Sequence, residues 1–143
     1  MYTPHTATVF NYTEGQVRAT VLEGVFLEES TGTGASITGA RSESEARLFI
    51  PFGVKAEDAF TGEKREYLPA KEYRARKDRD GFWTLEAEGQ KTETECWFTK
   101  GACAESCGYG ALRNKRDGVY RAAAAAVRDF GGAELRHWEV RGV

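Results

Sequence analysis

Short runs of β-branched and aromatic residues recur along the chain, and each run ends at turn-forming residues. Residues 6–12 form the first run, which stops at Glu14-Gly15, and residues 16–28 form the second. Such runs are typical of strands, and a two-residue connection containing glycine is typical of a hairpin. The pattern therefore predicts an N-terminal β-hairpin.

Further apolar runs predict three more strands and one helix. Residues 47–52 read as a strand in which Pro51 marks an edge or a strand end. Residues 82–85 and 96–98 read as a second hairpin around Gly89. Pro69 followed by good helix formers predicts one short helix over residues 69–76, and residues 54–64 read as a loop.

The alanine run at residues 122–126 allows two interpretations. Alanine has the highest intrinsic helix propensity, which favours a helix. However, the run is short, it is bounded by Gly118 and by Gly131-Gly132, and residues 135–140 alternate as a half-buried strand does. We expect residues 119–128 to form a strand, with residues 129–132 as the hairpin turn.

Residues 30–45 differ from the rest of the chain. Ser, Thr, Gly and Ala dominate, Ile37 is the only large apolar side chain, and neither a period of 2 nor one of 3.6 emerges. This composition predicts a long flexible loop. Loops of this length in compact domains tend to be functional or disordered.

Length and composition predict one domain over residues 1–143. Hydrophobic residues make up 41% of the chain, which is globular composition. The N-terminal residues lack the pattern of a signal peptide and no apolar run approaches a membrane span, so we expect cytosolic synthesis and no membrane partner. A net charge of −2 argues against a protein whose main work is gripping nucleic acid.

Candidate chemistry is sparse. The glycines between Gly32 and Gly39 do not match a phosphate-binding loop, because Ile37 stands where a dinucleotide fingerprint needs glycine and Arg41 stands where a P-loop needs Ser or Thr. Only His5 and His137 could activate a thiol, and they lie near opposite ends of the sequence. We expect no catalytic residues, no cofactor and no enzymatic activity.

Two features each allow a binding site as an alternative. Cys103 and Cys107 have a spacing found in zinc sites, which Cys96 or His137 could complete, although free thiols and a core position for Cys96 are the expected interpretation. Residues 71–79 gather positive charge beside Tyr73 and could contact phosphates or an acidic partner, although a solvated helix face is expected.

Several stretches together resemble a family of small minor structural proteins from phages and prophages of Gram-positive bacteria. The resemblance spans nearly the whole chain and rests on packing and turn motifs in their order. The stretches are residues 2–6 with Val9 and Phe10, and residues 20–27, 48–52, 67–73, 83–85, 99–101, 129–131 and 137–140.

The resemblance implies a head-completion, stopper-like protein of the virion, made in the host cytoplasm. Such proteins resemble small β-barrels that assemble as homo-oligomeric rings at the head–tail junction. The implied partners are other copies of the chain and neighbouring connector, portal or tail proteins, with DNA passing through the channel without sequence-specific binding. The predicted fold class is therefore all-β and mainly antiparallel, a small β-barrel or sandwich.

Residues of the expected loop and of the basic segment are the candidate interaction residues. We expect the loop to become ordered on assembly, as its composition changes so sharply there. The candidates are Thr31, Gly32, Thr33, Gly34, Ile37, Arg41, Arg74 and Arg76.

Two other functions remain alternatives. A small β-barrel could bind nucleic acid or peptide, using Trp83 or Trp97 as stacking surfaces with Arg74 and Arg76 nearby. A structural protein on the tail side of the junction is the third.

Overall fold

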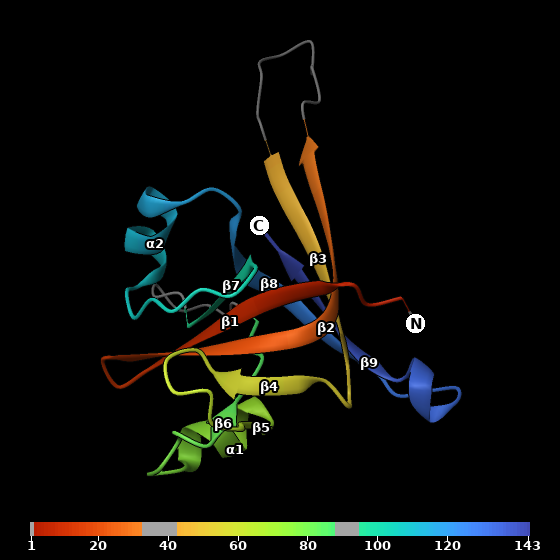
Figure 1. Cartoon of the computed structure of the whole chain (residues 1–143), viewed down its shortest axis with the longest axis horizontal. Helices are drawn as coiled ribbons and strands as arrows, with labels where there is room; N and C mark the ends of the chain where they lie inside the picture. Colours follow the sequence, from red (N-terminus) through yellow and green to blue (C-terminus); the bar gives the residue numbers. More distant parts are fainter. Residues whose placement is uncertain (1, 33–42, 88–94) are drawn as a thin grey trace.

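The computed structural model describes residues 2–32, 43–87 and 95–143 (Figure 1). Strands dominate and the helices are short. In chain order the elements are β1 (His5–Thr13), β2 (Gln16–Gly32), β3 (Glu43–Pro51), β4 (Lys55–Asp58), β5 (Glu66–Tyr67), α1 (Ala70–Ala75), β6 (Phe82–Trp83), β7 (Cys96–Lys100), α2 (Tyr109–Lys115), β8 (Val119–Arg128), the 3₁₀ helix η1 (Ala133–Leu135) and β9 (His137–Gly142).

Six strands close into a barrel. The order around it is β1-β7-β8-β9-β3-β2, and β2 pairs with β1 to complete the ring, with every neighbouring pair antiparallel. The long strand β2 makes closure possible, because its first half pairs with β1 and its second half with β3. The expected all-β, mainly antiparallel fold is confirmed, and it takes the form of a barrel.

The N-terminal hairpin is confirmed. Thr13 pairs with Gln16 across a two-residue turn. Glu14 and Gly15 both have positive φ, at 52° and 77°, which is the backbone of a type I′ turn and matches the twist of the flanking strands.

Alternating side chains of the strands fill the barrel. Val9, Leu48, Ile50 and Val140 are fully buried there. At Gly142 the interior is so crowded that an added Cβ would lie 2.5 Å from Phe98 Cζ. Glycine at this position therefore lets β9 approach the aromatic side chains of β7 and β8.

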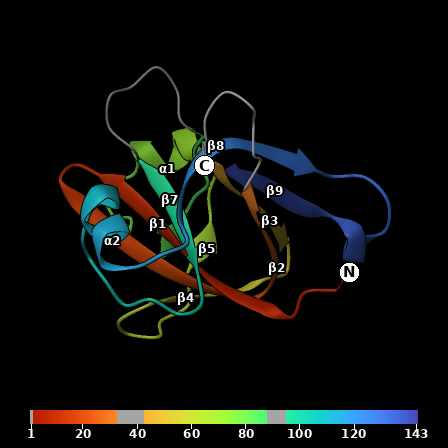
Figure 2. The ribbon, with the colours of Figure 1, turned by 90° about the horizontal axis from the view of Figure 1, so that it is seen from above.

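A second apolar cluster lies outside the barrel wall. Phe10 and Trp97 stack with ring centroids 5.7 Å apart, and Leu112 of α2 packs against this cluster. Figure 2 shows α2 outside the barrel, beside β1 and β7. Because β1 packs inward against the core and outward against this cluster, five successive residues of it are buried.

Three expectations about secondary structure are confirmed. The alanine run lies in strand β8, paired with β9, with a bulge between Ala122 and Ala124. The short helix forms as α1. Strand β3 ends at Pro51.

Both ends of the segment expected as a loop, residues 30–45, are strand. Ser30 pairs with Glu45, and Gly32 pairs with Glu43, so β2 and β3 continue into this segment. Polar side chains do not prevent a backbone ladder, because its hydrogen bonds use main-chain groups. The remainder of the expected loop, residues 33–42, lies outside the described residues.

Two other expectations are wrong, and one helix was not predicted. Residues 55–58 form β4, which pairs with β2, where a loop was expected. The second hairpin does not form, because β6 pairs in parallel with β5, while β7 pairs with β1 and β8; Gly89 lies outside the described residues. Helix α2 was not expected. It lies against β1 and β7 because Leu112 packs in the apolar cluster that contains Phe10 and Trp97.

Candidate assembly surface

The end of the β8–β9 hairpin exposes large apolar side chains. Val127 is 60% exposed, Phe130 71% and Leu135 51%. Among the described residues only Tyr2 and Phe60 are comparably exposed large hydrophobics. Figure 1 shows this hairpin end at the lower right, projecting beyond the barrel. We call Val127, Phe130 and Leu135 the apolar hairpin end.

The backbone of the hairpin end is held by local contacts. The Leu135 N–H donates to the Gly132 carbonyl at 2.9 Å, and Gly131 has a φ of +86°, which favours glycine. The Arg136 guanidinium and the Asp129 carboxylate lie 3.2 Å apart across the turn. The apolar side chains are therefore presented on an ordered turn.

Strand β8 leaves one edge open beside the hairpin end. It pairs with β7 only over residues 119–121, and from Ala122 onward its ladder partner is β9. Within the described ranges no strand pairs with the other edge of residues 122–128. Ala124 and Ala125 are also exposed. An open edge with small side chains is accessible to another chain.

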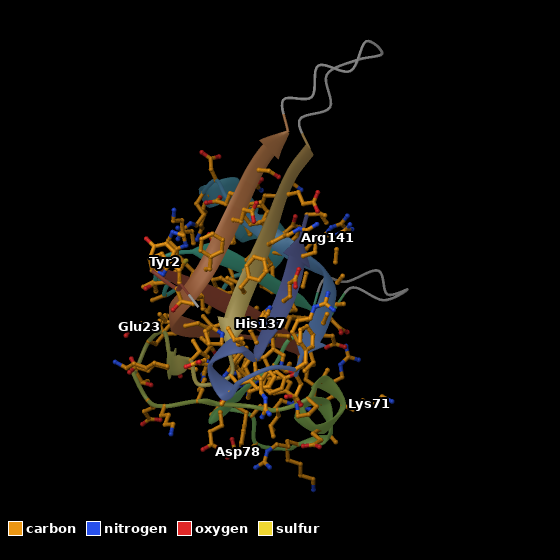
Figure 3. All side chains as sticks on the ribbon, turned by 90° about the vertical axis from the view of Figure 1, so that its right-hand side faces the viewer. Tyr2, Glu23, Lys71, Asp78, His137 and Arg141 are labelled. Carbon is orange, nitrogen blue, oxygen red and sulfur yellow. The ribbon has the colours of Figure 1, made fainter. Side chains whose placement is uncertain are left out.

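Aromatic rings form a continuous row on the outer face of β2, β3 and β9. Ring centroids are 6.5 Å apart for Tyr2 and Phe26, 5.5 Å for His5 and Phe26, 5.8 Å for Phe26 and Phe49, and 5.8 Å for Phe49 and His137. Figure 3 views this face, with Tyr2 and His137 labelled. We call these five residues the aromatic row.

Charged side chains lie beside the aromatic row. Arg128 and Glu139 are 3.3 Å apart, Arg47 and Glu139 are 3.7 Å apart, and Arg141 and Glu45 are 3.9 Å apart. Opposite charges thus alternate across β8, β9 and β3. These partly exposed pairs add little stability each, but they keep this face polar next to the rings.

Both histidines have structural partners. The His5 Nδ1 accepts a hydrogen bond from the Leu27 N–H at 3.0 Å, and the His137 Nδ1 lies 2.9 Å from the Leu135 carbonyl oxygen. Within the described ranges, no group of three or more His, Cys, Asp and Glu side chains is placed to hold a metal ion.

The cysteines are free, and Cys96 is a core residue, as expected. Burial raises the pKa of the Cys96 thiol to about 12. Because only the thiolate is a good nucleophile or metal ligand, this side chain stays inert near neutral pH. Cys103 is also buried, and Cys107 is half-buried.

The structure separates the expected interaction residues. Thr31 and Gly32 are strand residues of β2, paired with Ser44 and Glu43. Arg74 and Arg76 lie at α1, at the opposite end of the barrel from the β2–β3 hairpin in Figure 1. The candidates Thr33, Gly34, Ile37 and Arg41 lie outside the described residues.

Arg74 and Arg76 are engaged within the chain. The Arg74 guanidinium pairs with the carboxylates of Glu86 and Glu95. The Arg76 guanidinium lies 4.1 Å from the centre of the Phe82 ring. The tryptophans expected as stacking surfaces, Trp83 and Trp97, are buried.

The apolar hairpin end is absent from the residues that the sequence predicts as interaction sites. A turn at residues 129–132 is predicted, but no role for the large apolar residues beside it. Phe130 and Leu135 flank the turn glycines, and an apolar residue in a turn usually has nothing of its own chain to pack on. Large apolar residues beside turn glycines could therefore have indicated an exposed apolar surface.

Within the described residues, no helix has the length and apolar character needed to cross a bilayer.

Comparison with curated proteins finds no match, and comparison with solved structures finds none either. Comparison with protein families matches residues 2–143 to a family of unknown function, DUF6751. The match covers almost the whole chain, and the protein therefore belongs to the DUF6751 family.

Proposed function

We propose that this protein is a non-enzymatic assembly module that associates with further copies of itself through the apolar hairpin end. The sequence resemblance gives the setting of the proposal: a ring-forming, stopper-like component of a phage head–tail junction. Neighbouring connector, portal or tail proteins are the further partners, and the virion is the location.

The exposure of Val127, Phe130 and Leu135 within one hairpin carries the proposal. Large apolar side chains gathered on one projection mark interaction surfaces in folded proteins. Burying such a side chain in an interface contributes on the order of 1–3 kcal/mol. The three apolar side chains lie next to the open edge of β8. A second copy could therefore pack on these side chains and also hydrogen-bond to the backbone of β8.

A closed ring needs two different surfaces on each copy, one for each neighbour. The apolar hairpin end is one. The aromatic row supplies the second, because it lies on the outer face of β2, β3 and β9 and includes the half-buried rings of Phe26 and Phe49. In the proposed ring the hairpin end of one copy packs against the aromatic row of the next.

The charge of the protein is compatible with a channel for DNA. A net charge of −2 leaves little attraction for phosphates. A ring through which DNA passes benefits from this weak attraction, since strong contacts would hold the duplex in place.

Light scattering after size-exclusion chromatography tests the proposal on three proteins. The parent chain should show a mass that rises with concentration toward a multiple of the monomer. The double variant Phe130→Ser/Leu135→Ser should remain monomeric. The control Phe60→Ser removes a ring that is 58% exposed and lies outside the hairpin, so it should associate as the parent does.

Equal association of the double variant and the parent would overturn the assignment to the hairpin end. Circular dichroism spectra and unfolding midpoints of the three proteins verify that each is folded.

A binding module for peptide or nucleic acid is the second candidate, and the aromatic row favours it. Rings along an outer sheet face can stack on bases or on apolar peptide side chains. Salt-dependent retention on single-stranded DNA that is lost in Phe49→Ala would support this candidate. Retention unchanged by that substitution would exclude the aromatic row as its surface.

A further inference from the structure

Strands β8, β9, β3 and β2 form one antiparallel sheet with an open edge on each side. β1 pairs with β2 only as far as Val25, and β7 pairs with β8 only at residues 119–121. Within the described ranges, no strand pairs with the outer edge of residues 28–32 of β2 or with that of residues 124–128 of β8. Figure 3 shows β2 and β3 extending beyond β8 and β9.

The β8 edge lacks the features with which proteins usually protect an open edge. Such edges commonly carry lysine, proline or a bulge, which hinder pairing with another chain. Residues 124–127 are three alanines and a valine, and the bulge of β8 lies before them, between Ala122 and Ala124. Small side chains also let a second strand come close. The edge is therefore suited to pairing.

The directions of the four strands determine how a second copy can continue the sheet. Each neighbouring pair is antiparallel, so β2 and β8, at opposite edges, also run in opposite directions. A second copy in the same orientation would therefore place its β2 antiparallel to β8 of the first. Two different edges joined in this way produce the head-to-tail contact that a ring requires.

Two exposed charged residues indicate the register of such a pairing. Arg128 ends the open part of β8, and Glu28 begins the open part of β2. The Arg128 Nε lies 3.3 Å from Glu139, but a guanidinium group has five N–H donors and can bind a second carboxylate. The Glu28 carboxylate has no hydrogen bond or ion pair with any residue in the described ranges. The two charges are thus complementary between copies.

We propose that residues 28–32 of β2 in one copy pair antiparallel with residues 124–128 of β8 in the next copy, with Glu28 opposite Arg128. This inference rests on the self-association proposed above and names the strands that form it. The backbone hydrogen bonds of this pairing continue the sheet from one copy to the next.

The same register agrees with the packing of the apolar hairpin end. Antiparallel partners advance in opposite directions along their strands. Two residues beyond Arg128 therefore comes Phe130, opposite Phe26, which precedes Glu28 by two residues. Phe26 belongs to the aromatic row. Strand pairing and apolar packing are thus compatible in one interface.

Exchange of the two charges tests the register, with light scattering as the measurement. Glu28→Arg and Arg128→Glu should each raise the concentration of half-association roughly three- to tenfold, because an attraction becomes a repulsion. The double variant Glu28→Arg/Arg128→Glu restores opposite charges, so it should lie closer to the parent than either single variant does. The control Glu66→Arg makes the same charge change at an exposed position of β5 and should associate as the parent does.

Hydrogen exchange of the parent protein supplies a second measurement that needs no substitution. Amide exchange should slow in both residues 28–32 and residues 124–128 when the monomer associates, because both segments gain backbone hydrogen bonds. Residues 55–58 of β4 are already paired with β2, so their exchange should be equal in the two states.

The outcomes separate this pairing from self-association itself. Slower exchange in residues 124–128 alone would overturn the pairing in favour of two β8 edges related by a twofold axis. Association that is lost in Phe130→Ser/Leu135→Ser but protects neither segment, or that the double charge exchange does not recover, would also overturn it and leave the apolar hairpin end as the contact. A monomer at every concentration would overturn the proposed function and this inference together.

Discussion

The side chain of Asn11 on β1 binds the backbone of Thr84 as a neighbouring strand would. Its Nδ2 donates to the Thr84 carbonyl oxygen at 2.8 Å, and its Oδ1 accepts from the Thr84 N–H at 3.2 Å. This pair of bonds joins the segment after β6 to the barrel. It also explains why the expected hairpin between residues 82–85 and 96–98 does not form, since Thr84 is held by β1.

Asn11→Ala should destabilise the protein by about 2–4 kcal/mol, because it leaves the buried Thr84 N–H and carbonyl without partners. Urea unfolding measures this loss. Asn114→Ala, at an exposed position of α2, is the matched control and should change the free energy of unfolding by less than about 0.5 kcal/mol. Similar losses in both variants would show that the Thr84 bonds are not important.

Gly142→Ala should destabilise the barrel by about 1–3 kcal/mol, the usual cost of overpacking a core. The added methyl group would lie 2.5 Å from Phe98 Cζ and 2.6 Å from Tyr120 Cβ. Gly110→Ala in α2 is the opposite case, because no atom lies within 4 Å of the added Cβ and alanine favours a helix. Chemical unfolding of both variants should therefore give changes of opposite sign.

Alkaline pH should destabilise the protein partly through Cys96. Its ordinary pKa is 9.0, and burial raises the pKa in the folded protein to about 12. The folded state thus keeps a proton that the unfolded chain loses, so this contribution is complete below pH 9 and is lost as the pH rises toward 12. The slope from one such group is at most about 1.4 kcal/mol per pH unit.

Urea unfolding between pH 8 and pH 10.5 measures that slope. Cys96→Ala removes the titrating group, so its stability should fall less steeply with pH than that of the parent protein. Tyr120, whose pKa is raised by burial and by its contact with Glu29, leaves a residual slope in both proteins. Parallel curves would contradict the role assigned to Cys96.

Local sequence patterns predict those elements whose formation is determined by residues close by in the sequence. Glu14-Gly15 determines the first hairpin, and the glycines around residues 119–128 correctly indicate a strand despite the helix propensity of alanine. Elements that depend on distant residues were missed. Helix α2 is positioned by Leu112 packing near Phe10, and β4 is polar and recognisable only from its pairing with β2.

The same distinction holds for the candidate surfaces. The apolar hairpin end lies within ten residues of sequence, and Phe130 beside a glycine turn gave a readable signal. The rings of the aromatic row come from the segment before β1 and from β1, β2, β3 and β9. No spacing in the sequence links Phe26 to His137, so only the folded chain brings these rings into one row.

Native mass spectrometry of the parent chain across a range of concentrations tests self-association most directly, because it counts the subunits in each species. The proposed ring predicts one closed species with a fixed subunit number that becomes dominant as concentration rises, and loss of that species in Phe130→Ser/Leu135→Ser. A monomer at every concentration, unchanged when candidate connector proteins are added, would contradict the account.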